Sequence, residues 1–136
     1  MRKLFVVALF AVAPAMLGQI GRFEGDWKNA NPASRGIVRV IVRSTGTGAA
    51  TIQVFGSCTP TPCDWGVQPA VLYAPTVSSN PATTANAMTT AYKFSFKDVI
   101  VVLRPEGSAL SGQFFNRFTP GDGRTNYALF ERFVRK

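Results

Sequence analysis

Hydrophobic and polar residues alternate over short stretches along most of the chain, which is the pattern of a half-buried β-strand. Over 91–97, for example, Tyr92, Phe94 and Phe96 alternate with polar residues, and Lys97 falls on the polar face. One face of this stretch is therefore expected to meet a core and the other to meet water. Such two-sided strands are typical of antiparallel sheets.

Eight runs of this kind follow one another, and Val, Ile, Phe, Tyr and Thr dominate them. The runs are Arg22–Lys28, Ile37–Arg43, Ala50–Gly56, Trp65–Tyr73, Met88–Phe96, Val99–Leu103, Leu110–Phe118 and Asn126–Val134. Between them lie sequences rich in Gly, Pro, Asn and Asp, which favour turns. No longer segment beyond the N-terminal region has the periodicity of a helix. The pattern predicts an all-β protein.

The connections between the runs are short, except for the polar stretch Ala74–Ala87. Neighbouring strands should therefore pair in chain order as hairpins. Eight such strands with one buried face predict an eight-stranded antiparallel up-and-down barrel, because closing the sheet removes its exposed edges. A β-sandwich is the alternative. A barrel of this size has an interior that side chains fill or that holds one small ligand.

The first 18 residues have the pattern of an export signal. Two basic residues precede the apolar run Leu4–Leu17, which contains small residues suited to cleavage. Gln19 stands where a bacterial lipoprotein has its lipidated cysteine, so no lipid anchor is expected. The pattern predicts a Sec-type signal peptide over 1–18, one β-barrel domain over 19–136, and a secreted or periplasmic protein. A retained N-terminal anchor helix is the alternative.

The chain has a formal net charge of +8, and removal of Arg2 and Lys3 with the signal leaves +6. A positive protein favours anionic partners, and an anionic surface of the cell envelope is one candidate. The basic residues are scattered, however, and solubility explains them as well. Because the protein is expected to be exported, nucleic acid is not expected as its partner.

Gly25 and Trp27 form a G-x-W motif in the first predicted strand. With the chain length and the eight runs, this motif resembles the opening of the calycin barrels, the lipocalin and avidin group. The resemblance implies that Trp27 plugs one end of the barrel and that an arginine of the last strand packs across it by cation–π attraction. Arg132 is expected to be that arginine, with Arg135 as the second choice.

Asn29 extends the motif to G-x-W-x-N, which is similar to the start of avidins, where this asparagine helps to bind biotin. Avidins line their site with several further tryptophans, whereas this chain has only Trp65 besides Trp27, so biotin is not expected as the ligand. The stretch from Cys58 to Gly66 also resembles a C-x-P-x-x-C-D-W-G pattern of small exported bacterial proteins of undefined function. That second resemblance implies no activity.

Cys58 and Cys63 are the only cysteines of the chain, and export favours a disulfide between them. Because the chain has no histidine, two cysteines supply half the ligands of a zinc site, and their spacing does not match the C-x-x-C redox motif. We therefore predict a disulfide that braces the connection between the third and fourth runs. A chain-entropy treatment gives it about 2 kcal/mol. No metal or cofactor is expected.

Trp65 is expected either to roof the barrel mouth or to pack as core, and Asn29, Tyr73 and Tyr92 are the other candidate ligand-binding residues. The lack of histidine excludes Ser-His-Asp and Cys-His catalysis, so no catalytic residue is assigned.

The leading hypothesis is an exported, non-enzymatic barrel that binds a small apolar or amphipathic ligand or a partner protein. One alternative is a protease-inhibitor-like or cell-envelope interaction protein, whose N-terminal tail around 19–22 inserts into a protease. A second alternative is a glycan-active enzyme that works with acids alone, with Asp64 and Glu131 as candidates.

Overall fold

The computed structural model describes residues 20–136 as nine strands and two short helices. The elements are α1 (Ile20–Phe23), β1 (Gly25–Asn29), β2 (Ile37–Gly46), β3 (Ala49–Gly56), β4 (Cys63–Pro69), β5 (Val71–Tyr73), α2 (Pro81–Thr84), β6 (Ala87–Lys93), β7 (Lys97–Glu106), β8 (Ala109–Phe118) and β9 (Tyr127–Arg135). The predicted signal peptide over 1–18, and with it the alternative of an anchor helix, lies outside the described residues. Within the described part, no helix is long and apolar enough to cross a membrane.

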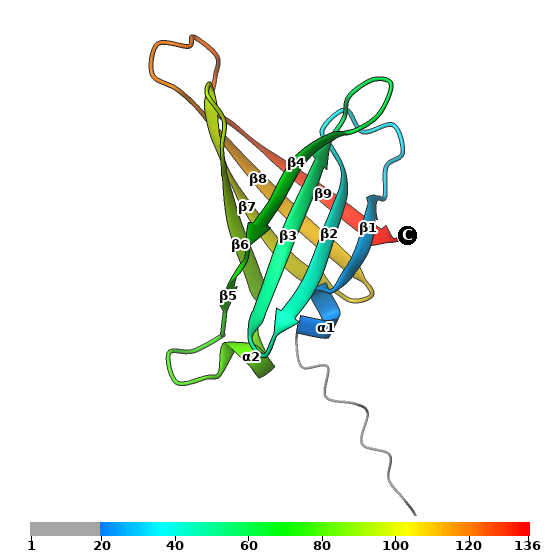
Figure 1. Cartoon of the computed structure of the whole chain (residues 1–136), viewed down its shortest axis with the longest axis vertical. Helices are drawn as coiled ribbons and strands as arrows, with labels where there is room; N and C mark the ends of the chain where they lie inside the picture. The colour runs from blue at the N-terminus through cyan, green and yellow to red at the C-terminus, as the bar shows by residue number, and fades with distance from the viewer. Residues whose placement is uncertain (1–19) are drawn as a thin grey trace, which may run out of the picture.

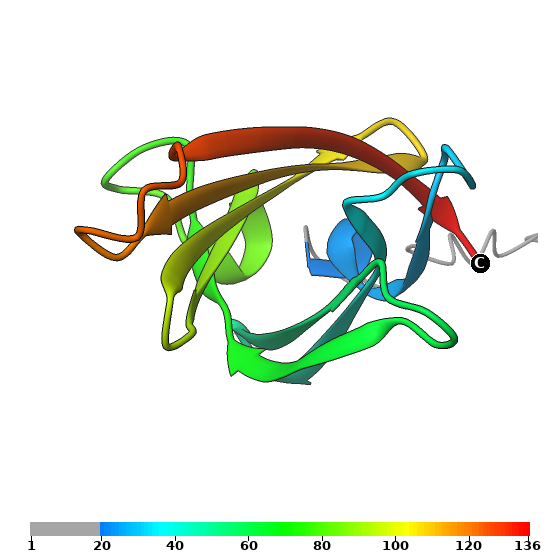
Figure 2. The same cartoon turned by 90° about the horizontal axis from the view of Figure 1, so that it is seen from above.

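All nine strands belong to one antiparallel sheet, in the order β4-β3-β2-β1-β9-β8-β7-β6-β5. Apart from β1 beside β9, neighbours in the sheet follow one another in the chain, which is an up-and-down topology (Figure 1). Seen from above, the strands form a ring with α1 inside its outline (Figure 2). The sheet thus curls into a nearly closed barrel, which confirms the predicted fold class and excludes the β-sandwich.

The barrel closes along a seam between β4 and β6, which are not neighbours in the hydrogen-bonded order. Side chains bridge this seam. The Tyr92 hydroxyl donates to the Gly66 carbonyl oxygen at 2.8 Å, and the Thr90 hydroxyl donates to the Pro69 carbonyl oxygen at 2.9 Å. These bonds join the two strands where the backbone ladder does not.

The strand count is nine rather than eight, because the predicted run Trp65–Tyr73 is divided at Ala70. The backbone N–H of Ala70 donates to the Ala50 carbonyl oxygen at 2.9 Å, and the chain then leaves β3 and pairs with β6 as β5. The preceding Pro69 has no N–H with which to extend the ladder. The first strand also begins later than predicted, because the residues up to Phe23 form α1.

The inner face of the sheet fills most of the barrel. In β3, Ala50, Ile52 and Val54 are buried while the residues between them are half-buried, as the predicted alternation requires. The largest fully buried side chains are Trp27, Phe23, Phe114, Phe133, Ile52, Met88, Leu103 and Leu110.

Trp27 and α1 close one end of the barrel. The Trp27 side chain is fully buried, and its Nε1 donates to the Phe23 carbonyl oxygen at 2.8 Å. The guanidinium of Arg135 lies over the indole, with Cζ 4.3 Å from the ring centroid, and donates to the carbonyl oxygens of Glu24 and Gly21. The last strand therefore holds α1 in place over the end of the barrel.

The prediction that Arg132 packs across Trp27 is wrong, because Arg135 takes that place. Successive side chains of a strand point to opposite faces of the sheet. Arg135 shares the inner face with the buried Phe133, whereas Arg132 is exposed on the outer face. Gly25 belongs to the same arrangement, since a Cβ there would lie 2.5 Å from Arg135 Nη1 and would displace the guanidinium.

Candidate functional site

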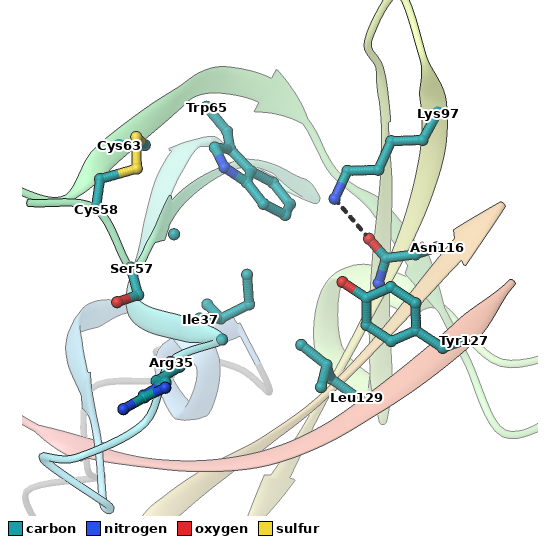
Figure 3. Close-up of a pocket in the computed structure, with 12 residues that line it drawn as sticks. Arg35, Ile37, Ser57, Cys58, Cys63, Trp65, Lys97, Asn116, Tyr127 and Leu129 are labelled. Carbon is teal, nitrogen blue, oxygen red and sulfur yellow. Dashed lines mark hydrogen bonds between the residues drawn. A yellow bond between two sulfur atoms is a disulfide. The ribbon is translucent and has the colours of Figure 1, made fainter. Parts of the chain in front are cut away.

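A cavity of about 210 Å³ opens at the other end of the barrel. The loops 30–36, 57–62 and 119–126 surround this end together with the β6–β7 hairpin, opposite α1 (Figure 1). The lining residues are Arg35, Gly36, Ile37, Gly56, Ser57, Cys58, Cys63, Trp65, Lys97, Asn116, Tyr127 and Leu129 (Figure 3). Core side chains fill the interior beneath them, so the cavity is confined to the mouth of the barrel.

Trp65 forms one wall of the cavity. Its ring packs edge-on against Tyr92 and Phe94, with centroids 5.5 and 5.2 Å away. Gly56 on β3 makes room for the indole, since a Cβ there would lie 3.0 Å from Trp65 Nε1. Trp65 is half-buried, so it packs against the core and also presents part of its ring to the cavity. The two predicted positions of Trp65, in the core and at the barrel mouth, are therefore compatible with each other.

Lys97 faces Trp65 across the cavity (Figure 3). Its Nζ donates to Asn116 Oδ1 at 2.9 Å and lies 5.3 Å from the centroid of the Trp65 ring. The rings of Phe94 and Phe96 are 5.8 and 5.7 Å from the same atom. The ammonium group is thus held by one amide and surrounded by aromatic rings.

The inward position of Lys97 differs from the sequence-based prediction. The alternation over 91–97 places Lys97 on the water-facing side, but β6 ends at Lys93 and β7 begins at Lys97. The turn at 94–96 interrupts the strand, and the alternation restarts in β7. There Lys97 shares the inner face with the buried Val99.

The charges around the cavity are unbalanced. Arg35 and Lys97 line it, and none of its lining residues is a carboxylate. Neither of these cations forms an ion pair with any residue of 20–136. Burial lowers the pKa of the Lys97 ammonium, and the positive charge of Arg124 lowers it further.

The predicted disulfide between Cys58 and Cys63 is confirmed, with a Cα–Cα distance of 5.4 Å. It closes the loop between β3 and β4 and forms part of the cavity wall. The backbone N–H of Ser57 donates to the Gly36 carbonyl oxygen at 2.8 Å, which ties this loop to the connection before β2. The disulfide therefore fixes the shape of one side of the mouth.

Among the predicted ligand residues, Trp65 lines the cavity and Asn29 does not. Asn29 is buried, and its polar atoms already have partners within the barrel. Its Nδ2 donates to the Ile37 carbonyl oxygen at 2.7 Å and to Glu131 Oε2 at 3.0 Å, and its Oδ1 accepts from the Asn31 N–H at 2.8 Å. Asn29 thus joins β1 to β2 and β9.

Tyr92 and Tyr73 also lie outside the cavity lining. The Tyr92 hydroxyl is buried between the carbonyl oxygens of Gly66 and Ile52, at 2.8 and 3.2 Å, and burial raises its pKa to about 12. Tyr73 is exposed on β5, where its hydroxyl accepts from Thr89 Oγ1 at 3.3 Å. The structure therefore brings Trp65 and Tyr92 into contact, but only Trp65 of the four predicted residues lines the cavity.

Sequence reasoning missed the polar groups of the cavity, which include the side chains of Arg35, Lys97 and Asn116 and the hydroxyl of Tyr127. Asn116 had a recognisable signal, because it lies two residues after the buried Phe114 and therefore on the same, core-facing side of β8. A polar residue on a buried face needs a hydrogen-bond partner and therefore marks a special position. Tyr127 lies directly opposite Asn116 on β9.

The acids proposed for catalysis, Asp64 and Glu131, do not line the cavity. The Asp64 carboxylate accepts from Gln53 Nε2 and from a backbone N–H, and these hydrogen bonds lower its pKa. Glu131 accepts from Ser34 Oγ at 3.0 Å as well as from Asn29. Over residues 20–136, no group of three or more Cys, Asp or Glu side chains is placed to hold a metal ion.

A second concavity, of about 230 Å³, lies on the outer surface of the sheet. Ile100 and Phe115 are opposite each other there on β7 and β8, and both are exposed. Lys93, Asp98 and Arg117 flank them, so charges of both signs are present. Its two cations, Lys93 and Arg117, are exposed, in contrast to the half-buried Lys97 at the mouth.

Comparison with known proteins identifies no relative: no protein-family model, no curated protein and no solved structure matches this chain. What the mouth can bind therefore follows from its own residues. An aromatic wall faces a cation, an amide and a phenol hydroxyl across one small cavity.

Proposed function

We propose that the chain is an exported, calycin-like barrel that binds a small amphipathic molecule at its open end, without catalysis. The composition of the mouth carries this proposal. Trp65, Tyr127 and Leu129 supply apolar surface, and Lys97 and Asn116 supply polar groups in the same cavity (Figure 3). Sites for small molecules combine these features, a mostly apolar concave surface and a few converging polar groups.

The filled interior limits how the ligand is held. Phe114, Phe133 and Leu110 are fully buried inside the barrel and leave the mouth as the accessible part. The cavity of about 210 Å³ is smaller than a site that encloses a drug-sized molecule, roughly 300–1,000 Å³. The ligand is therefore small, or it is one end of a longer molecule whose remainder stays outside.

Two further observations support the proposal. The N-terminal pattern over 1–18 and the disulfide favour a secreted or periplasmic protein, since disulfides persist in oxidising compartments. The buried Trp27 with Arg135 across its ring is the arrangement that the resemblance to calycins implies.

The inhibitor-like alternative has less support. Its tail around 19–22 would have to leave the barrel and enter a protease, but Ile20 is buried in α1 at the closed end. Arg135 also holds this segment through the carbonyl oxygens of Gly21 and Glu24. Freeing the tail would therefore expose part of the core.

Titration with N-phenyl-1-naphthylamine, a neutral aromatic dye that fluoresces in apolar sites, tests the proposal. We expect one saturable site per chain. Trp65→Leu and Tyr127→Ser should each weaken binding by about five- to tenfold, because each removes part of the apolar wall.

Phe130→Ser is the matched control, because Phe130 is 69% exposed and does not line the mouth. This variant should leave the dye affinity unchanged. A protein without a saturable site, or one whose site is weakened only by Phe130→Ser, would refute the proposal and favour a partner protein as the ligand.

A further inference from the structure

Lys97 is a half-buried ammonium group with fewer partners than it can bind. An ammonium donates up to three hydrogen bonds. Asn116 Oδ1, at 2.9 Å, is its one hydrogen-bond partner within residues 20–136. The rings of Trp65, Phe94 and Phe96 lie 5.3, 5.8 and 5.7 Å from Nζ, and they attract a cation without carrying an opposite charge.

No carboxylate of the cavity compensates the charge of Lys97. Removing an ammonium partly from water disfavours its charged form, and an opposite charge normally offsets this effect. Here the nearby charged groups are Arg35 in the lining and Arg124 at the rim, and Asp122 is already paired with Arg124 at 2.6 Å. The mouth therefore presents a positive charge beside an aromatic wall.

We infer that the molecule bound at the mouth is an amphipathic anion whose carboxylate, phosphate or sulfonate group pairs with Lys97. This inference rests on the proposed function and adds the charge of the ligand to it. The anion accepts from the remaining donors of Lys97, and the apolar part lies against Trp65 and Tyr127. Arg35, exposed at the opening, attracts the anion during its approach.

Two dyes with a similar aromatic scaffold and different charge test the inference. 8-Anilinonaphthalene-1-sulfonate carries a sulfonate, whereas N-phenyl-1-naphthylamine is neutral. We expect the protein to bind the sulfonate dye at least about tenfold more tightly, which corresponds to about 1.4 kcal/mol.

Lys97→Met keeps a long apolar side chain and removes the charge. It should weaken binding of the sulfonate dye about tenfold or more and leave binding of the neutral dye within about twofold. Lys93→Met is the matched control, because Lys93 lies on the same hairpin, is exposed and does not line the cavity. It should change neither affinity.

Arg35→Gln is a second variant, at an exposed position where the fold is not at risk. It should weaken binding of the sulfonate dye by about two- to fivefold and reduce the dependence of that binding on salt. If Lys97→Met and Arg35→Gln both keep the wild-type ratio of the two affinities, the inference is overturned while the proposed function stands. If neither dye depends on Trp65 or Tyr127, both are overturned.

Octanoate and anionic vesicles distinguish two sources of the anion. Displacement of the sulfonate dye by octanoate, and not by 1-octanol, identifies a free amphiphile. Cosedimentation with phosphatidylglycerol vesicles but not with phosphatidylcholine vesicles, lost in Lys97→Met, identifies an anionic lipid headgroup. Failure of both anionic probes counts against the inference.

Discussion

The two ends of the barrel combine the same residue types in different ways. At the closed end, Trp27 is fully buried, and Arg135 Cζ lies 4.3 Å from the centroid of its ring. At the open end, Trp65 is half-buried, and Lys97 Nζ lies 5.3 Å from its ring. Both ends pair a tryptophan with a cation, but one pair is a plug and the other is the wall of a cavity.

The two pairs differ in how their polar groups are satisfied. At the closed end, the Arg135 guanidinium donates to the backbone carbonyl oxygens of Glu24 and Gly21. At the open end, Lys97 has one amide partner within the described part of the chain. The Trp27–Arg135 pair therefore stabilises the fold, whereas the Trp65–Lys97 pair lines an open cavity, where we propose that it binds a ligand.

Replacing each tryptophan in turn should separate the plug from the wall. Trp27→Ala is expected to lower the free energy of unfolding by about 3–5 kcal/mol, because it empties a fully buried site and loosens α1. Trp65→Ala should lower it by about 1–2 kcal/mol, because the indole is partly exposed already and two edge-on aromatic contacts are lost. Urea denaturation measures both values, and equal losses would contradict the distinction between the two ends.

The seam beside the mouth should give the protein a pH dependence at alkaline pH. Burial raises the pKa of Tyr92 to about 12, against about 10 in an unfolded chain. The folded state therefore keeps a proton that the unfolded state loses. The contribution of Tyr92 to the free energy of unfolding is therefore fully present below pH 10. It falls by about 2–3 kcal/mol as the pH rises from 10 to 12.

Tyr92→Phe is the control for this prediction, since it keeps the ring and removes the titrating hydroxyl. At pH 8 it should be less stable than the wild type by about 1 kcal/mol, because the hydrogen bond to Gly66 is lost. Urea denaturation between pH 8 and pH 12 should show a shallower decline for the variant. Parallel declines would show that another group causes the effect.

Much of the fold could be predicted because alternation within a strand is a local property. Ile52 and Val54, for example, are buried as the pattern of β3 requires. The break at Ala70 could not be predicted in this way, because it depends on where the closing barrel moves the chain from β3 to β6. Barrel closure involves residues far apart in the sequence, which no local pattern records.

The candidate site was harder to predict than the fold, because it depends on where strands end. Continuous alternation over 91–97 predicts that Lys97 lies on the outer face. This prediction is wrong, because the turn at 94–96 separates β6 from β7 and the alternation starts again at Lys97. The resemblance to avidins made Asn29 a candidate ligand-binding residue. In the structure its Nδ2 donates instead to the carboxylate of Glu131, which is far away in the sequence. The choice of Arg132 was avoidable, since the alternation from Phe133 points to Arg135.

The smallest expected effects come from the cations, and they test most directly whether the two ends differ. Arg135→Met should lower the free energy of unfolding by about 1–2 kcal/mol, because its hydrogen bonds and its contact with Trp27 are lost. Lys97→Met should change it by no more than about 0.5 kcal/mol, since the loss of the hydrogen bond to Asn116 and of the attraction to the rings is offset by removal of a half-buried charge. Arg132→Met, on the outer face, gives the baseline in the same urea denaturation. If Lys97→Met destabilised the protein as much as Arg135→Met, Lys97 would be a second structural cation, and the mouth would be a second plug rather than a binding site.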